Sequence, residues 1–180
     1  MKRALAISSV LLAVVAAGLW NVSASATAAQ QASLTAKFGP HKQANLPPLP
    51  FGPRDPLPRP TPVVAQVFQF AAEHPEVLSY IPCFCGCDHM GHKGNDDCFV
   101  KQRAANGDVV AWEPHGTECQ VCIDVGQQAM QMYSSGASVT QIRQAVETKF
   151  AGKYQFHTPT PQPPAKVAAP TPPAKAPAKK

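Results

Sequence analysis

All six cysteines of this 180-residue chain fall between positions 83 and 122. Three alternate with other residues within 83–87, one stands at 98, and a Cys-x-x-Cys pair closes the stretch at 119–122. Thiolate and imidazole are the ligands that soft and borderline transition metals prefer. The candidate metal ligands are therefore the six cysteines and two neighbouring histidines: Cys83, Cys85, Cys87, Cys98, Cys119, Cys122, His92 and His115.

The alternate spacing in Cys83-Phe84-Cys85-Gly86-Cys87 favours metal coordination. Residues two apart on an extended chain project to the same side, so three sulfurs can converge on one centre while Phe84 faces the core. Gly86 allows a sharp bend. Disulfides within the triplet are disfavoured because so small a ring strains the bond.

The second cysteine motif is expected at the start of a helix. Thr117-x-x-Gln120 has the pattern of a capping box. Cys119 and Cys122 are three residues apart and would share one helix face. The positive end of the helix dipole favours thiolate there. His115, immediately before this helix, is placed to join the pair.

The loop after the triplet adds imidazole and thioether groups. His92 and His115 are the stronger candidate ligands, and His89 and Met90 are the weaker ones. Asp96 is expected to be a charge at a helix N-terminus or on the surface.

The elements that must position these ligands are predicted to form a mostly α-helical domain. It would contain about four helices joined by irregular Cys-rich loops, with a short strand or extended loop over 108–112. A second capping box, Ser138-x-x-Gln141, predicts the start of the last helix. Helices are expected over 61–73, 95–106, 117–134 and 138–149.

Composition divides the chain into four parts. Residues 1–26 read as a signal peptide, with a basic start, an apolar run and Ala24-Ser-Ala26 before the cleavage point. The Pro-rich spacer 27–60 and the Pro/Ala/Lys-rich tail 158–180 have few apolar side chains, so disorder is expected. Residues 61–157 form the Cys-rich domain. The apolar run is short for a membrane span, which needs about 20 residues.

We therefore expect export to the periplasm, the cell envelope or the exterior, and no membrane span after signal cleavage. The chain carries a net charge of +5, but residues 61–157 hold six Lys and Arg against ten Asp and Glu. An acidic domain argues against nucleic acid as a partner. The basic tail is a candidate contact for the envelope surface. No Ser–His–Asp set, His-Glu-x-x-His or glycine-rich phosphate loop is present, so catalysis is not expected.

The order of several short motifs is that of a known family. The motifs are Tyr80-Ile-Pro-Cys-Phe-Cys-Gly-Cys, Gly91-His-Lys, Asp97-Cys-Phe, Pro114-His-Gly and Cys119-x-x-Cys. The chain resembles the PCYCGC-motif family of exported bacterial proteins over roughly residues 70–150. Phe84 stands where the motif has tyrosine, which removes a hydroxyl but no ligand. The resemblance implies export and a Cys-rich domain.

Three functions remain open at this point. The first is an exported metal-binding protein that handles or buffers metal in the cell envelope, with copper(I) preferred and zinc next. The second is a structural or interaction domain stapled by three disulfides, which six cysteines in an oxidising compartment permit. The third is a thiol–disulfide oxidoreductase using Cys119-x-x-Cys122, although no βαβ pattern surrounds that motif.

Overall fold

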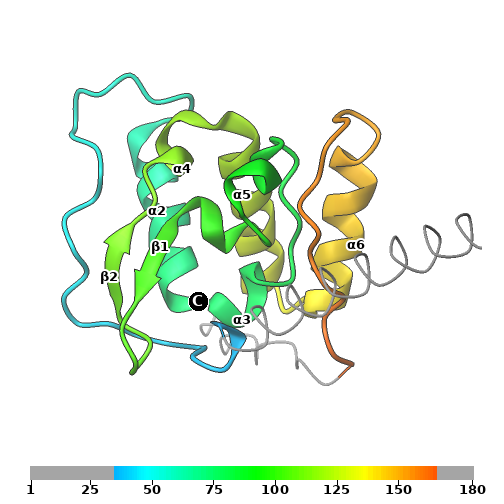
Figure 1. The fold of residues 1–180 in the computed structure, drawn as a ribbon, viewed down its shortest axis with the longest axis horizontal. Coiled ribbons are helices and arrows are strands. Elements are labelled where there is room, and N and C mark those ends of the chain that lie inside the picture. The colour runs from blue at the N-terminus through cyan, green and yellow to red at the C-terminus, as the bar shows by residue number, and fades with distance from the viewer. Residues whose placement is uncertain (1–34, 166–180) are drawn as a thin grey trace, which may run out of the picture.

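The computed structural model describes residues 35–165 (Figure 1). The expected signal peptide and the tail beyond residue 165 lie outside the described residues. None of the helices in the described part is long and apolar enough to cross a membrane. The elements are α2 (Thr61–Glu73), α3 (Pro75–Leu78), η1 (Cys87–Met90), η2 (Asp96–Cys98), β1 (Val100–Arg103), β2 (Val109–Trp112), α4 (His115–Glu118), α5 (Gln120–Ser134) and α6 (Val139–Phe150), where η marks a 3-10 turn.

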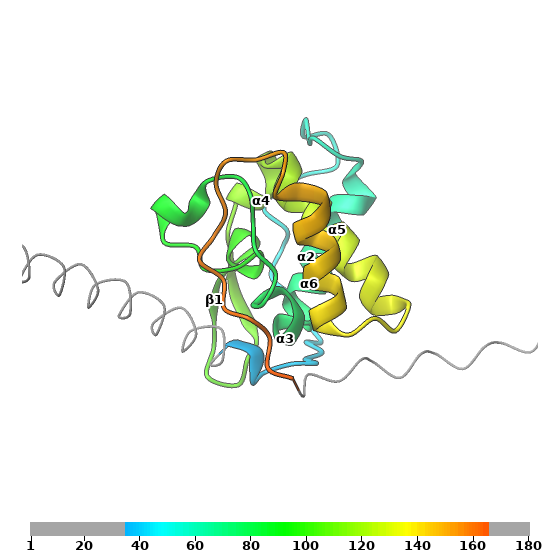
Figure 2. The ribbon, with the colours of Figure 1, turned by 90° about the vertical axis from the view of Figure 1, so that its right-hand side faces the viewer.

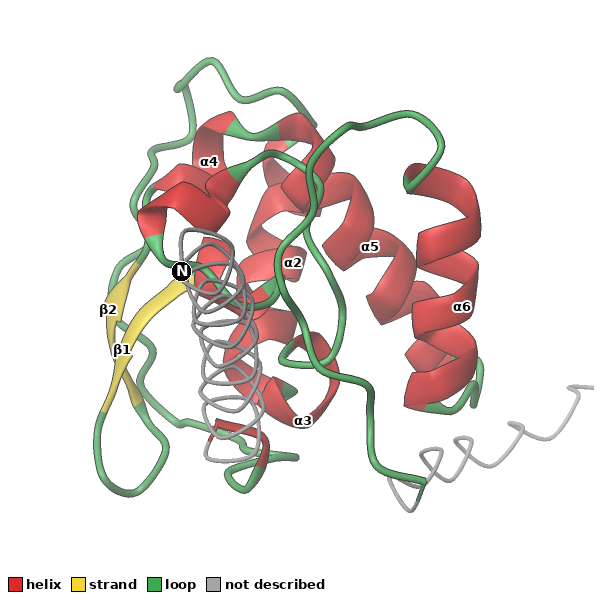
Figure 3. Cartoon of the chain, turned by 45° about the vertical axis from the view of Figure 1, so that its right-hand side comes forward, coloured by secondary structure: helices red, strands yellow, loops and turns green. Residues whose placement is uncertain are grey.

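The prediction of a mostly α-helical domain of about four helices is wrong. Five α-helices within residues 35–165 make up less than half of that part, and β1 and β2 form an antiparallel sheet beside them (Figure 3). The helix expected over 95–106 does not form, because η2 ends at Cys98 and the chain continues as β1. Gly107, at a φ of 98°, reverses the chain so that Val100 pairs with Trp112. This cross-strand pairing satisfies the backbone groups that a helix would have satisfied locally.

The hydrophobic core fastens this hairpin to the helices. Pro62 lies in the first turn of α2, where its missing N–H is not needed. One face of α2, including Val67 and Phe68, is buried, and α2 packs against α5. The Phe68 ring lies edge-to-face with Phe99 at 5.1 Å and with Trp112 at 5.5 Å between ring centres. Such pairs stabilise a core beyond the area they bury.

The Pro-rich segment before α2 lies against the domain from residue 41 to residue 59, alongside β2 in Figure 1. The indole N–H of Trp112 donates to the Pro47 carbonyl at 3.0 Å. Arg59 forms two hydrogen bonds of 2.7 Å with the Asp124 carboxylate. Contacts with the domain therefore begin before residue 61. The expected disorder of residues 27–60 remains a prediction.

The chain after α6 folds back between α6 and the cysteine loop (Figure 2). Buried Arg143, from α6, donates hydrogen bonds to the carbonyls of Tyr80, Thr160 and Pro161 at 3.0, 3.1 and 2.6 Å. Thr158 and Thr160 are themselves buried. Residues just beyond the predicted boundary at 157 thus contact the domain, while the disorder of 158–180 stays a prediction.

Candidate metal centre

The loop that follows α3 carries the three alternate cysteines, and a bend at Gly86 shapes it. Gly86 has a φ of 77°, a conformation that favours glycine, and η1 begins at the next residue, Cys87. The bend adds to the extended spacing and turns the three sulfurs toward one another. Phe84 faces the core, as expected, and its ring stacks 5.8 Å from that of Phe150.

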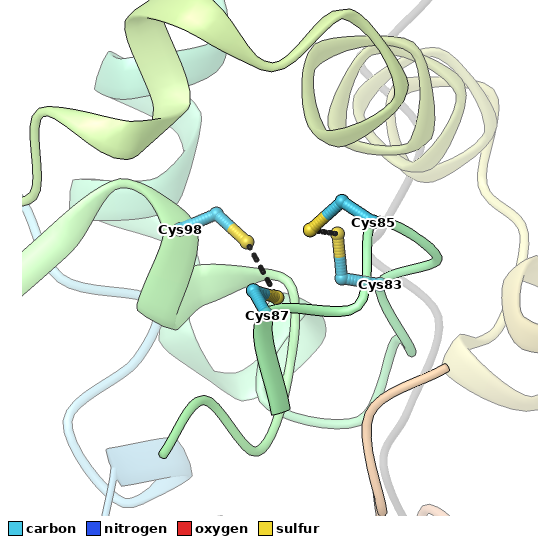
Figure 4. A group of neighbouring side chains, drawn as sticks. All are labelled: Cys83, Cys85, Cys87 and Cys98. Atoms are coloured by element: carbon cyan, nitrogen blue, oxygen red, sulfur yellow. Dashed lines mark hydrogen bonds between the residues drawn. The ribbon is translucent and has the colours of Figure 1, made fainter. Parts of the chain in front are cut away.

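The first group of candidate ligands consists of Cys83, Cys85, Cys87 and Cys98 (Figure 4). All four Sγ atoms lie within 4.8 Å of one another. The Sγ–Sγ distance is 3.6 Å between Cys83 and Cys85 and 3.8 Å between Cys87 and Cys98. Cys98 comes from η2, which the hairpin anchors. Cys83, Cys87 and Cys98 are buried, and Cys85 is half-buried.

A second group joins Cys85 to His115, Cys119 and Cys122, again with all ligand atoms within 4.8 Å of one another. Cys85 Sγ lies 3.5 Å from His115 Nε2 and 3.4 Å from Cys122 Sγ. The sulfurs of Cys119 and Cys122 are 2.7 Å apart. Cys85 therefore belongs to both groups.

The capping box predicted at Thr117 does not form. The Thr117 hydroxyl donates to the Pro114 carbonyl inside α4, and the chain breaks to an extended conformation at Cys119. Cys119 Sγ then accepts a 3.4 Å hydrogen bond from the Cys122 backbone N–H. Cys119 thus caps α5 with its own sulfur, and both sulfurs sit at the positive end of the helix dipole.

The two favoured histidines lie at different places on this cluster. His115 Nε2 belongs to the second group, while buried His92 has Nδ1 at 3.6 Å from Cys98 Sγ. Their rings lie edge-to-face, 5.8 Å apart. His89 is exposed, hydrogen-bonds the Gly86 carbonyl and belongs to neither ligand group. Met90 is 47% exposed.

All six cysteines are free thiols. A disulfide requires an S–S distance of about 2.05 Å. The 2.7 Å between Cys119 and Cys122 is the shortest Sγ–Sγ distance in the cluster. Every one of the six sulfurs is therefore available as a ligand, and the cluster could hold a metal.

Crowding of the thiols separates their pKa values. Hydrogen bonds with neighbouring thiols, chiefly Cys122, hold the pKa of Cys83 well below its usual value. Neighbouring thiols, chiefly Cys119, likewise lower the pKa of Cys85. The hydrogen bond with Cys119 raises the pKa of Cys122, and the neighbouring Cys122 thiol raises the pKa of Cys98. Metal binding requires thiolates, so it would release protons from cysteines whose pKa is raised.

Three residues that sequence reasoning did not assign hold the ligand-bearing segments together. Asn95 donates its backbone N–H to the Ile81 carbonyl at 2.8 Å and its side-chain amide to the Cys122 carbonyl at 3.2 Å. Gly116 lets α4 approach closely, because a Cβ there would lie 2.5 Å from the Cys98 carbonyl oxygen.

Thr158 is the third of these residues. It donates its backbone N–H to the Cys83 carbonyl and accepts the Cys83 N–H at its hydroxyl oxygen, both at 2.9 Å. The Pro-rich tail has no regular spacing of apolar residues, so no local sequence pattern predicts this contact.

Comparison with known proteins agrees with the motifs. The model of the family described as "Protein of unknown function with PCYCGC motif" matches residues 49–163, and the chain belongs to this family. The match includes part of the Pro-rich segment and Thr158, which contact the domain in the structure. No curated protein and no solved structure matches the chain.

Proposed function

We propose that this protein is exported and holds a soft metal ion in the cell envelope. The observation that carries the proposal is the gathering of six free cysteine sulfurs and His115 Nε2 into two groups of four ligand atoms. Free cysteine is often buried as a small hydrophobe, but that role does not require six sulfurs to converge. Convergent thiolates select late transition metals.

Copper(I) is the ion that we favour. Soft thiolates prefer copper(I), and the complete burial of Cys83, Cys98 and Cys122 keeps water from the bound ion. His89 and Met90 lie two and three residues after Cys87 and offer imidazole and thioether at the surface beside the cluster. This arrangement supports handling or buffering of copper, with the outer residues as a first contact for an arriving ion.

Zinc is the second candidate, and the composition of the two groups supports it. One group has four cysteines and the other has three cysteines and one histidine, and both sets occur in structural zinc sites. Zinc would then stabilise the fold, because metal binding to a small domain is coupled to folding.

A binding role is favoured over catalysis. Each group already offers four protein ligands, whereas a catalytic zinc site keeps one position open. The oxidoreductase alternative has weaker support, because Cys119 and Cys122 follow the short helix α4 and not a strand of a βαβ unit.

The proposal is tested on protein purified anaerobically from its own envelope fraction. Elemental analysis should find copper or zinc, and mass measurement should find the metal on the native ion and six free thiols after denaturation. Protein that lacks metal and has lost six hydrogens to three disulfides would contradict the proposal. The disulfide-stapled domain would then take its place.

A further inference from the structure

We infer that the cluster binds two metal ions and that Cys85 Sγ bridges them. The inference rests on the proposed metal binding and adds the number of ions and the role of one sulfur. The first ion would lie among Cys83, Cys85, Cys87 and Cys98, and the second among Cys85, His115, Cys119 and Cys122.

The number of ligands supports two ions with one shared sulfur. The two groups of four contain seven different residues, because Cys85 belongs to both. Two tetrahedral ions need eight metal–ligand bonds. Seven ligand residues supply eight bonds only if one of them binds both ions, and a thiolate sulfur has the lone pairs to do so.

The distances agree with this arrangement. A zinc–sulfur bond of about 2.3 Å in tetrahedral geometry places two sulfurs of one site about 3.8 Å apart. The corresponding distances are 3.6 Å for Cys83–Cys85, 3.8 Å for Cys87–Cys98 and 3.4 Å for Cys85–Cys122. Cys119 and Cys122, at 2.7 Å, would have to move apart by about 1 Å to bind one ion. The seven ligands do not form one group within 4.8 Å, so a single ion cannot bind them all.

The position of Cys85 explains why it is the bridge. Its sulfur contacts Cys83 of the first group at 3.6 Å and, from the second, Cys122 at 3.4 Å and His115 Nε2 at 3.5 Å. Cys83 also approaches Cys122, at 3.2 Å, but it does not belong to the group that contains Cys119 and His115.

Charge also favours more than one ion. Six thiolates carry six negative charges, and four of these cysteines are buried. One zinc ion would leave four negative charges uncompensated, whereas two leave only two. One copper(I) ion would leave five, and two would leave four. An uncompensated buried charge is costly. His92 Nδ1 beside Cys98 Sγ and the N-terminus of α5 at Cys119 can stabilise the remaining charge.

The inference is tested by titrating the reduced full-length chain with ¹¹³Cd²⁺, a thiolate-binding ion that NMR detects directly. We expect saturation at two ions per chain and two resonances of equal area. Scalar coupling through the shared sulfur should split both resonances.

Three variants identify the bridge. Cys87→Ser removes a ligand of the first group only, and Cys119→Ser removes one of the second group only. Each should leave one strongly bound ion and one unsplit resonance. Cys85→Ser should abolish the splitting. The wild-type spectrum decides the question even if a variant fails to fold.

The outcomes separate this inference from the proposed function. Saturation at one ion, or two resonances without splitting, overturns the bridged pair but leaves metal binding intact. Failure of the reduced wild-type chain to bind cadmium, copper(I) or zinc overturns the proposed function, and the inference falls with it.

Discussion

At the scale of single residues, the position of a side chain relative to the sulfur cluster decides whether it can be a metal ligand. His115 and His89 have the same side chain, and each lies in a four-residue helical segment, His115 in α4 and His89 in η1. His115 Nε2 belongs to a ligand group, whereas exposed His89 hydrogen-bonds a backbone carbonyl. The pair therefore offers a matched test of the centre.

His115→Ala should weaken binding of the second ion at least 10- to 100-fold, because even the loss of a residue that only supports a ligand costs that much. His89→Ala should leave the affinity unchanged. Competition with a chromophoric chelator measures both variants. Equal affinities would remove His115 from the centre.

Asp96 lies in the first turn of η2, one of the two places expected for it, but it is buried and is not a surface charge. Its carboxylate accepts a hydrogen bond of 3.3 Å from the Ser79 hydroxyl. Desolvation, with repulsion from Asp97, raises its pKa from 3.8 to about 8. The folded chain therefore binds this proton more tightly than the unfolded chain does.

The stability that Asp96 contributes should be complete below pH 3.8 and should be lost as pH rises toward 8. Asp96→Asn cannot ionise, so the variant should gain stability relative to wild type as pH rises from 5 to 8. Urea unfolding at a series of pH values checks this. Parallel curves for the two proteins would show that Asp96 does not titrate in this range.

At the scale of elements, the centre depends on how closely α4 approaches η2. Gly116 permits that approach, because a Cβ would lie 2.5 Å from both the Cys98 carbonyl oxygen and the Phe99 ring. A backbone oxygen and a buried aromatic ring cannot move aside as the end of a flexible side chain could. The contact brings η2, which ends at Cys98, close to α4, which is followed by Cys119.

Gly116→Ala should lower the free energy of unfolding by about 1–3 kcal/mol, as overpacking does, and should weaken metal binding. Gly152→Ala is the matched control, because a Cβ there meets nothing within 4 Å. Denaturant unfolding and metal titration measure both. Equal stability of the two variants would mean that α4 can shift without harm.

At the scale of the whole molecule, segments far apart in sequence enclose the cysteine loop. The Pro-rich segment covers β2 and the start of α5, and the chain after α6 hydrogen-bonds to both backbone groups of Cys83. Arg143 holds that chain through two of its carbonyls. The ends of the domain thus restrain the loop that carries three ligands.

A chain that ends at residue 157 should lose about 2 kcal/mol or more of stability, since several hydrogen bonds worth about 0.5–1.5 kcal/mol each disappear. It should also release metal faster. A chain that ends at residue 165 keeps Thr158 and the partners of Arg143, and should match the full chain. Identical metal release from both truncated chains would show that the contact does not restrain the loop.

Export can be tested on the same scale. The mature chain should begin near Thr27, because Ala24 and Ala26 provide the small residues that signal peptidase requires. Ala26→Trp should block cleavage and leave residues 1–26 attached. N-terminal sequencing of protein from the envelope reads both results, and wild-type protein that begins at Met1 would contradict the prediction.

The chemistry of the centre was readable in the sequence because it depends on residue type and short spacing. The inward position of Phe84 and the capping box Ser138–Gln141 were predicted, and the structure contains both. These features depend on side chains within a few residues of one another. Local patterns suffice for them.

Tertiary contacts decided how these parts combine. Pairing of Val100 with Trp112 replaced the expected helix, and α4 packs closely against η2 just before α5 begins at Gln120. The two ligand groups that share Cys85 bring together residues from the 83–87 loop, η2, α4 and the start of α5. Each feature joins segments that are well apart in the chain. Its free energy depends on loop closure and on packing between these segments, which local sequence patterns do not predict.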